Sequence, residues 1–87
     1  MYFIKKAELS DLERISSLFD AYRIFYNYSS DIEGAQKFLK DRIAKNESEI
    51  FMALTPSGTA VGFTQLYPLF SSTRMKRLWL LNDLYVD

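Results

Sequence analysis

Two neighbouring polar side chains, Asn82 and Asp83, interrupt the otherwise apolar and aromatic stretch LWLLNDLYVD at residues 78–87. Side chains alternate between the two faces of a strand, and both alternating sets of this stretch contain large apolar residues. The pattern therefore predicts a strand that is buried on both faces, in the middle of a sheet. A carboxylate and an amide inside such a strand cost free energy unless they are hydrogen-bonded or meet a polar ligand. Two interpretations are open, a satisfied polar pair in the core and a functional site.

The carboxylate of Asp83 is the sharpest candidate for chemistry. In a buried strand it can accept hydrogen bonds from an ammonium group or act as a general base. Three other residues are candidates for the wall of the same site: Gln65 stands among apolar residues of another expected strand, and Tyr22 and Tyr26 end an expected helix beside the polar break at residues 27–29. For these three, a role in the core and a role at a site are both open.

Composition excludes several classes of function. The chain has 87 residues, which is enough for one domain at most, and a chain of this size buries only about 60% of its unfolded surface. Its 11 basic and 11 acidic residues balance and form no block of like charge, so a nucleic-acid partner or an anionic membrane surface is not favoured. The absence of cysteine and histidine excludes disulfides, a cysteine nucleophile, a histidine-based triad and the usual zinc sites, and no metal is expected. The chain has no apolar run of membrane-spanning length and no signal peptide, which predicts a cytoplasmic protein.

Two helices are expected in the first half of the chain. Apolar residues recur at spacings of three and four from Ser10 to about Tyr26, and again from residue 30 until Asn46 offers a stop. Capping boxes are expected at both starts, with Ser10 paired to Glu13 and Ser30 paired to Glu33. Residues 27–30 form the break between the helices.

Four strands are expected around these helices. Residues 2–6 form the first, residues 49–54 and 60–70 form a hairpin around the turn TPSGT, and residues 78–87 form the last after a basic turn at 74–77. Tyr67 shares a strand face with Gln65, and Pro68 is expected near a strand end or at a bulge because it has no amide to donate. The order β-α-α-β-β-β predicts an α+β fold with a mostly antiparallel sheet and two helices.

This order, together with the segments VGFTQLYP and LWLLNDLYVD, resembles the first half of the GCN5-related N-acetyltransferase (GNAT) superfamily, in a branch similar to the diamine and polyamine acetyltransferases. The resemblance covers nearly all of this chain and about half of the family domain. It implies that residues 1–87 are a single partial domain that stops before the family's Arg/Gln-x-x-Gly-x-Gly/Ala loop. That loop holds the pyrophosphate of coenzyme A at a helix N-terminus.

The resemblance also implies a mechanism and a set of site residues. Acetyl-CoA would be the cosubstrate, with its pantetheine arm against the main chain of Leu84, Tyr85 and Val86, and an amine would attack the thioester directly. Where the polyamine branch has a glutamate followed by an aspartate, this chain has Asn82 followed by Asp83, which leaves Asp83 as the candidate base, directly or through water. Only a bulge would bring both side chains to one site.

The implied acceptor is a primary amine on a small molecule or peptide, and polyamines, aminoglycosides and protein N-termini all fit. The acceptor side would be lined by Tyr22, Tyr26, Gln65 and Tyr67, with Asp83 nearest the amine. The alternative function is a non-catalytic half-domain that binds a partner or associates with a copy of itself through its open sheet.

The number of elements predicts self-association. The last three strands look apolar on both faces, but two helices normally cover only one face of a small sheet. We therefore expect a homodimer or a higher oligomer, through the uncovered face or through pairing of the last strand. The isolated chain is also expected to be inactive, because the pyrophosphate-binding loop that the resemblance implies is not part of it.

Overall fold

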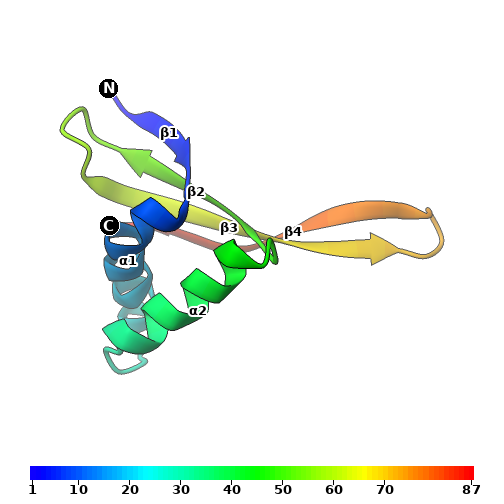
Figure 1. The fold of residues 1–87 in the computed structure, drawn as a ribbon, viewed down its shortest axis with the longest axis horizontal. Helices are drawn as coiled ribbons and strands as arrows, with labels where there is room; N and C mark the ends of the chain where they lie inside the picture. Colours follow the sequence, from blue (N-terminus) through cyan, green and yellow to red (C-terminus); the bar gives the residue numbers. More distant parts are fainter.

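The computed structural model describes all residues, 1–87, as one four-stranded antiparallel sheet with two helices on one of its faces (Figure 1). The strands are neighbours in the order β1-β2-β3-β4. The α+β class and the order β-α-α-β-β-β are confirmed. Neither helix is long and apolar enough to cross a lipid bilayer. The elements are β1 (Phe3–Lys6), a 3-10 turn (Leu9–Asp11), α1 (Leu12–Phe25), α2 (Ile32–Ala44), β2 (Glu49–Leu54), β3 (Ala60–Ser71) and β4 (Lys76–Val86).

The core lies between the helices and the sheet. In β2, alternate side chains are buried, as expected for a strand with one covered face. They pack with apolar residues of both helices and of β3 in one cluster. The fully or nearly fully buried members are Ala7, Ile15, Leu18, Leu39, Ile50, Met52, Leu54 and Phe63.

Both expected capping boxes are wrong, because an aspartate next to each serine provides the acceptor. At the first helix, a 3-10 turn precedes Leu12, and the Asp11 carboxylate accepts from the Glu8 amide at 2.9 Å. At the second, Asp31 is the N-cap and accepts from the Gly34 amide at 2.9 Å. Ser30 instead donates to the buried Asp20 at 2.7 Å, which also accepts from the Asp31 amide at 2.7 Å and so fixes the loop between the helices. The expected stop at Asn46 is confirmed, since Asn46 has a φ of 53° just after α2.

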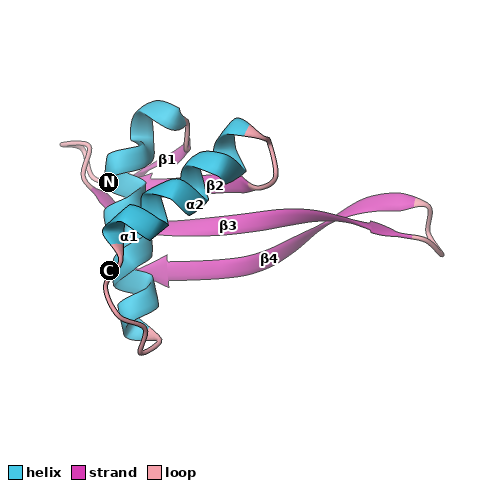
Figure 2. Cartoon of the chain, turned by 60° about the horizontal axis from the view of Figure 1, so that its bottom comes forward, coloured by secondary structure: helices cyan, strands magenta, loops and turns pink.

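Strands β3 and β4 extend beyond the rest of the sheet as a two-stranded ribbon (Figure 2). Strand β2 pairs with β3 only as far as Leu66, whereas the β3–β4 ladder continues to the pair Ser71 and Lys76. Pro68 lies in this ribbon, where no β2 residue requires its missing amide. Lys76 and Arg77 were expected in the basic turn, but they belong to β4.

The expectation that residues 78–87 lie in the middle of the sheet is wrong, because β4 is the edge strand and most of its apolar side chains are exposed. Its two faces also differ from those predicted by strict alternation. Gln65 pairs with Asp83 but Leu66 pairs with Leu81, so Asn82 is an extra residue in a bulge. Each bulge residue moves all later side chains to the other face.

As a result, residues 78, 80, 83 and 85 point to the side of the sheet on which the helices lie, although Leu80, in the ribbon, is exposed. Residues 79, 81, 84 and 86 point to the open side.

Candidate active site

The carboxylate of Asp83 is the centre of a buried hydrogen-bond cluster on the helix-covered face. Its Oδ1 accepts from the Tyr22 hydroxyl of α1 at 2.8 Å and from the Asn82 amide at 3.2 Å. Its Oδ2 accepts from Gln65 Nε2 of β3 at 2.9 Å. The structure thus brings together four of the residues singled out in the sequence, from three different elements.

Ser48 extends this cluster, and sequence reasoning missed it. The residue lies between α2 and β2, and its hydroxyl donates to Gln65 Oε1 at 2.8 Å. A lone serine in a connection carries no pattern that distinguishes it from a solvent-exposed loop residue. Only the packing of α2 against the sheet places it over Gln65.

The bulge in β4 brings Asn82 and Asp83 to the same site. Two consecutive residues of a regular strand face opposite ways, but here the Asn82 amide reaches the Asp83 carboxylate. On the neighbouring strand, the Thr64 hydroxyl donates to the Asp83 carbonyl at 3.0 Å. This bond provides a partner for the main chain at the irregularity.

The tyrosines of the site form an aromatic wall. Tyr22 packs edge-on against Phe63 and Tyr26, with ring centroids 5.4 and 5.2 Å away. Burial and the hydrogen bond to Asp83 raise the pKa of Tyr22 to about 12, so its hydroxyl stays a donor at neutral pH. Burial and the nearby charge of Asp83 also raise the pKa of Tyr67. Tyr26 is largely exposed and contacts Tyr22, without a hydrogen bond to the cluster.

No cation neutralises Asp83. The five ion pairs of the structure involve other carboxylates, those of Glu8, Asp11, Glu47 and Glu49. The three donors to the Asp83 carboxylate are all neutral, and Asp83 as a whole residue is 6% exposed. A carboxylate whose hydrogen-bond partners are all neutral has no counter-ion in the protein, which suits it to bind an ammonium group or to accept a proton from it.

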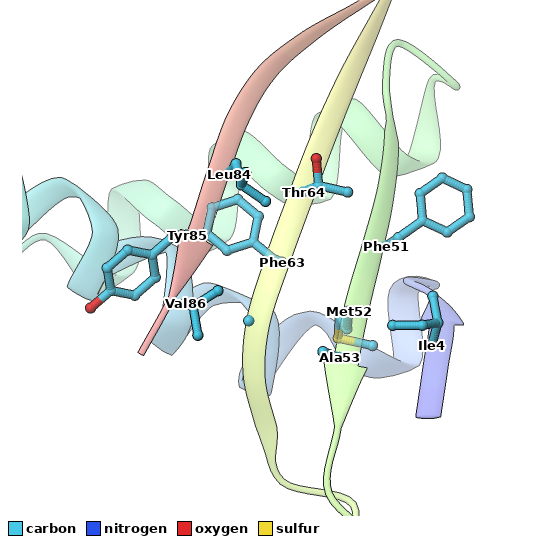
Figure 3. Close-up of a pocket in the computed structure, with 10 residues that line it drawn as sticks. Ile4, Phe51, Met52, Ala53, Phe63, Thr64, Leu84, Tyr85 and Val86 are labelled. Atoms are coloured by element: carbon cyan, nitrogen blue, oxygen red, sulfur yellow. The ribbon is translucent and has the colours of Figure 1, made fainter. Parts of the chain in front are cut away.

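The C-terminal end of β4 borders an apolar groove on the open face (Figure 3). The side chains of Leu84 and Val86 lie there with Ile4 and Phe51. The Asp87 amide donates to the Val61 carbonyl of β3 at 2.9 Å. Because main-chain groups alternate in direction, the amides of Leu84 and Val86 point away from β3 at the free edge, whereas that of Tyr85 points toward β3. The ring of Tyr85 instead packs near Tyr22, on the helix-covered face.

The structure groups no three histidine, cysteine, aspartate or glutamate side chains that could hold a metal ion.

Comparison with known proteins finds acetyltransferases. The chain is 51% identical over 83 residues to the uncharacterized N-acetyltransferase YhfO of Bacillus subtilis, covering 95% of this chain and 55% of that protein. It is 38% identical over 81 residues to a probable acetyltransferase of Haemophilus influenzae, covering 93% and 56%. The chain therefore spans about half the length of the curated relatives it matches. No protein-family model matches the sequence.

Solved structures agree with these relatives. The crystal structure of a probable acetyltransferase has a TM-score of 0.93 and 45% identity, covering 97% of this chain and 56% of that one. An aminoglycoside acetyltransferase from an uncultured soil sample, solved with sisomicin, has a TM-score of 0.68 and 30% identity, covering 99% and 56%. A Clostridium acetobutylicum protein solved with acetyl-CoA shares the fold, with a TM-score of 0.79, 13% identity and coverage of 100% and 60%.

Proposed function

We propose that this chain, which matches the first half of GNAT-type acetyltransferases in sequence and fold, supplies the acceptor side of an acetyl-CoA-dependent N-acetyltransferase. Residues 1–87 would then be part of a larger catalytic domain. The observation that carries the proposal is the buried Asp83 carboxylate, which is held by neutral donors only and lies in the strand that borders the apolar groove.

The chemistry assigned to Asp83 is the removal of a proton from the amine. An amine is protonated at neutral pH and attacks a thioester only as the neutral form. Asp83 attracts the ammonium group and accepts its proton, directly or through water. The hydrogen bonds from Tyr22 and Gln65 hold the carboxylate in one orientation, which lowers the entropic cost of bringing amine and thioester together.

Acetyl-CoA would bind at the free edge of β4. The outward amides of Leu84 and Val86 can pair with the pantetheine arm as a neighbouring strand would, and a main-chain amide at this edge can stabilise the oxyanion that forms at the thioester carbonyl. A protein with the same fold was solved with acetyl-CoA, which supports acetyl-CoA as the ligand that we propose. The main-chain amide of Tyr85 points toward β3, so the contribution of this residue to acetyl-CoA binding would come from its ring, which packs near Tyr22.

The proposed acceptor is a cationic primary amine of a small molecule. The negative charge of Asp83 and the adjacent rings of Tyr22 and Tyr26 favour a cation, which both hydrogen bonds and aromatic faces attract. Tyr67, whose pKa is raised by burial and by the charge of Asp83, is proposed to line the same side. The 30% identical protein solved with the aminoglycoside sisomicin supports this class. A diamine or polyamine is the specific acceptor that we propose.

A chimera tests the proposal. Residues 1–87 are joined to the part of the Bacillus subtilis relative that the match does not cover, and thiol release from acetyl-CoA is measured with a diamine, a polyamine and sisomicin. We expect amine-dependent release in the chimera. For the 87-residue chain alone we expect no release and an acetyl-CoA dissociation constant of about 1 mM or weaker by calorimetry, because it has no pyrophosphate-binding loop. A folded chimera that is inactive with all three amines would contradict the function, and low-micromolar binding by the chain alone would contradict the need for the loop.

A second candidate function is a non-catalytic module that associates through its sheet. The observation that favours it is the open face, where Trp79, Leu81, Leu84 and Val86 are exposed on one strand. Thiol release by the chimera distinguishes the two candidates.

A further inference from the structure

We propose that Ser48 is a positioning residue of the site: through the side-chain amide of Gln65 it determines how the Asp83 carboxylate is presented to its ligand. The role in amine acetylation rests on the proposed function, whereas the effect on Gln65 and Asp83 does not.

The three side chains form an uninterrupted buried chain of hydrogen bonds. Ser48 Oγ donates to Gln65 Oε1 at 2.8 Å, and Gln65 Nε2 donates to Asp83 Oδ2 at 2.9 Å. The exposed fractions of Ser48, Gln65 and Asp83 are 8%, 0% and 6%. Water therefore cannot readily replace a lost partner at Gln65.

Asp83 and Ser48 together determine the orientation of the Gln65 amide in this chain. The two ends of a glutamine amide differ, since one only accepts and the other only donates. The Asp83 carboxylate only accepts, so it selects the NH2 end of Gln65. The Ser48 hydroxyl, which can donate as well as accept, then donates to the carbonyl end on its own side. The opposite orientation would place Oε1 against Oδ2, two acceptors with like partial charge. Without the Ser48 hydroxyl, Oε1 is a buried acceptor without a partner, and the carbonyl end of the amide loses the contact that holds it in place.

Gln65 also determines which position on Asp83 is available. Oδ1 accepts two hydrogen bonds, from Tyr22 and Asn82, whereas Oδ2 accepts one, from Gln65. A carboxylate oxygen offers two lone-pair positions. The second lone-pair position of Oδ2 is therefore the one left for an ammonium group. The direction of this lone pair depends on how the Gln65 amide, held by Ser48, orients the carboxylate.

The first test is hydrogen exchange of the Gln65 side-chain NH2 group, followed by NMR on the full chain. We expect Ser48→Ala to accelerate this exchange by about tenfold or more, the factor for losing one hydrogen bond, while the core amides of Ile15 and Met52 keep their protection. Ser48→Thr retains a hydroxyl and should restore the slow exchange. Ser48→Cys has a weak donor and should give an intermediate rate, and it replaces Ser48→Ala in the test if the alanine variant does not fold.

Ser16→Ala is the matched control. Ser16 is also fully buried, but its hydroxyl has no hydrogen-bond partner and lies on α1 outside the cluster. We expect this variant to leave Gln65 exchange unchanged. Unchanged Gln65 exchange in folded Ser48→Ala, or an equal acceleration in Ser16→Ala, would overturn the proposal.

The second test is kinetic and uses the chimera. We expect Ser48→Ala to lower kcat by about tenfold with little change in KM for acetyl-CoA, because a misaligned Asp83 affects the chemical step and not the pantetheine contacts. Ser48→Thr should recover kcat. If the chimera transfers no acetyl group while Gln65 exchange responds as expected, the proposed function fails and the positioning role stands. If the chimera is active and Gln65 exchange does not respond, the function stands and the positioning role fails.

Discussion

At the scale of residues, the site depends on a carboxylate whose partners are all neutral. Asn82 and Gln65 stand in apolar surroundings in the sequence, and the structure accounts for both, since each donates to Asp83. The amide at residue 82 is a donor at every pH. It therefore orients Asp83 and does not compete with it for a proton.

The first prediction concerns Asp83. In the chimera, Asp83→Asn should lower turnover by about a hundredfold, since the asparagine keeps the shape of the side chain but cannot accept the amine proton. Steady-state thiol release measures the effect. Glu33→Gln, which neutralises an exposed carboxylate on α2, is the control and should leave turnover unchanged. A rate for Asp83→Asn equal to that of the parent across the pH range would remove Asp83 from the mechanism.

At the scale of elements, a second carboxylate holds the start of α1 against two neighbouring segments. Asp11 accepts from Lys5 of β1 and from Arg14 of α1, and Arg14 also donates to the Gly58 carbonyl in the β2–β3 turn at 2.7 Å. Burial alone would raise the pKa of Asp11. The hydrogen bonds from Lys5, the Glu8 amide and Arg14 outweigh burial and lower this pKa to about 2.

The second prediction follows from the sign of that shift. A carboxyl group whose pKa is lower in the folded state stabilises the fold above its unfolded pKa of about 4, and this stabilisation is lost as pH falls from about 4 through about 2. Two pH units correspond to about 2–3 kcal/mol, so we expect a loss of about 2 kcal/mol in the free energy of unfolding across this window. Denaturant titrations at several pH values measure it.

Asp11→Asn should be less stable at neutral pH and should have a smaller pH dependence between about 4 and 2. Glu33→Gln serves again as the control and should show the parent's pH dependence. If Asp11→Asn and the parent lose stability in parallel, the Asp11 network does not act as described.

At the scale of the whole molecule, one sheet face is covered by helices and the other is apolar and open. Leu84 and Val86 are 65% and 75% exposed there, and β4 has an unpaired edge. Both features favour association. Burying even about 400 Å² of apolar surface would contribute roughly 10 kcal/mol before the costs of association, which is large compared with the stability of a small domain.

The third prediction is therefore that the 87-residue chain forms a homodimer or higher oligomer through this face or edge. Light scattering after size exclusion at micromolar concentration measures its mass. Leu84→Lys should shift the chain toward monomer, while Leu9→Lys, at an exposed leucine in the 3-10 turn, should not. A well-folded monomer without dye-binding apolar surface would show that the open face does not drive association.

The sequence by itself determined the elements and their order. Apolar spacing marked both helices, and the turn TPSGT marked the hairpin, because these signals arise from backbone geometry and from contacts between residues close in the chain. It also pointed to Asp83 and Gln65 as unusual, since a polar residue in an apolar strand requires a partner wherever the strand lies.

Only the tertiary structure decided which strand lies at the edge, where β4 bulges, and what surrounds Asp83. The apolar residues of β4 looked like those of a central strand, but burial depends on which neighbours cover a face, and no local pattern reports that. The bulge at Asn82 reversed the faces of half the strand, and it exists only in the register between β3 and β4. Tyr22 reaches the Asp83 carboxylate directly and Ser48 reaches it through Gln65, although both are distant in the chain, because α1 and the α2–β2 connection pack over the same part of the sheet.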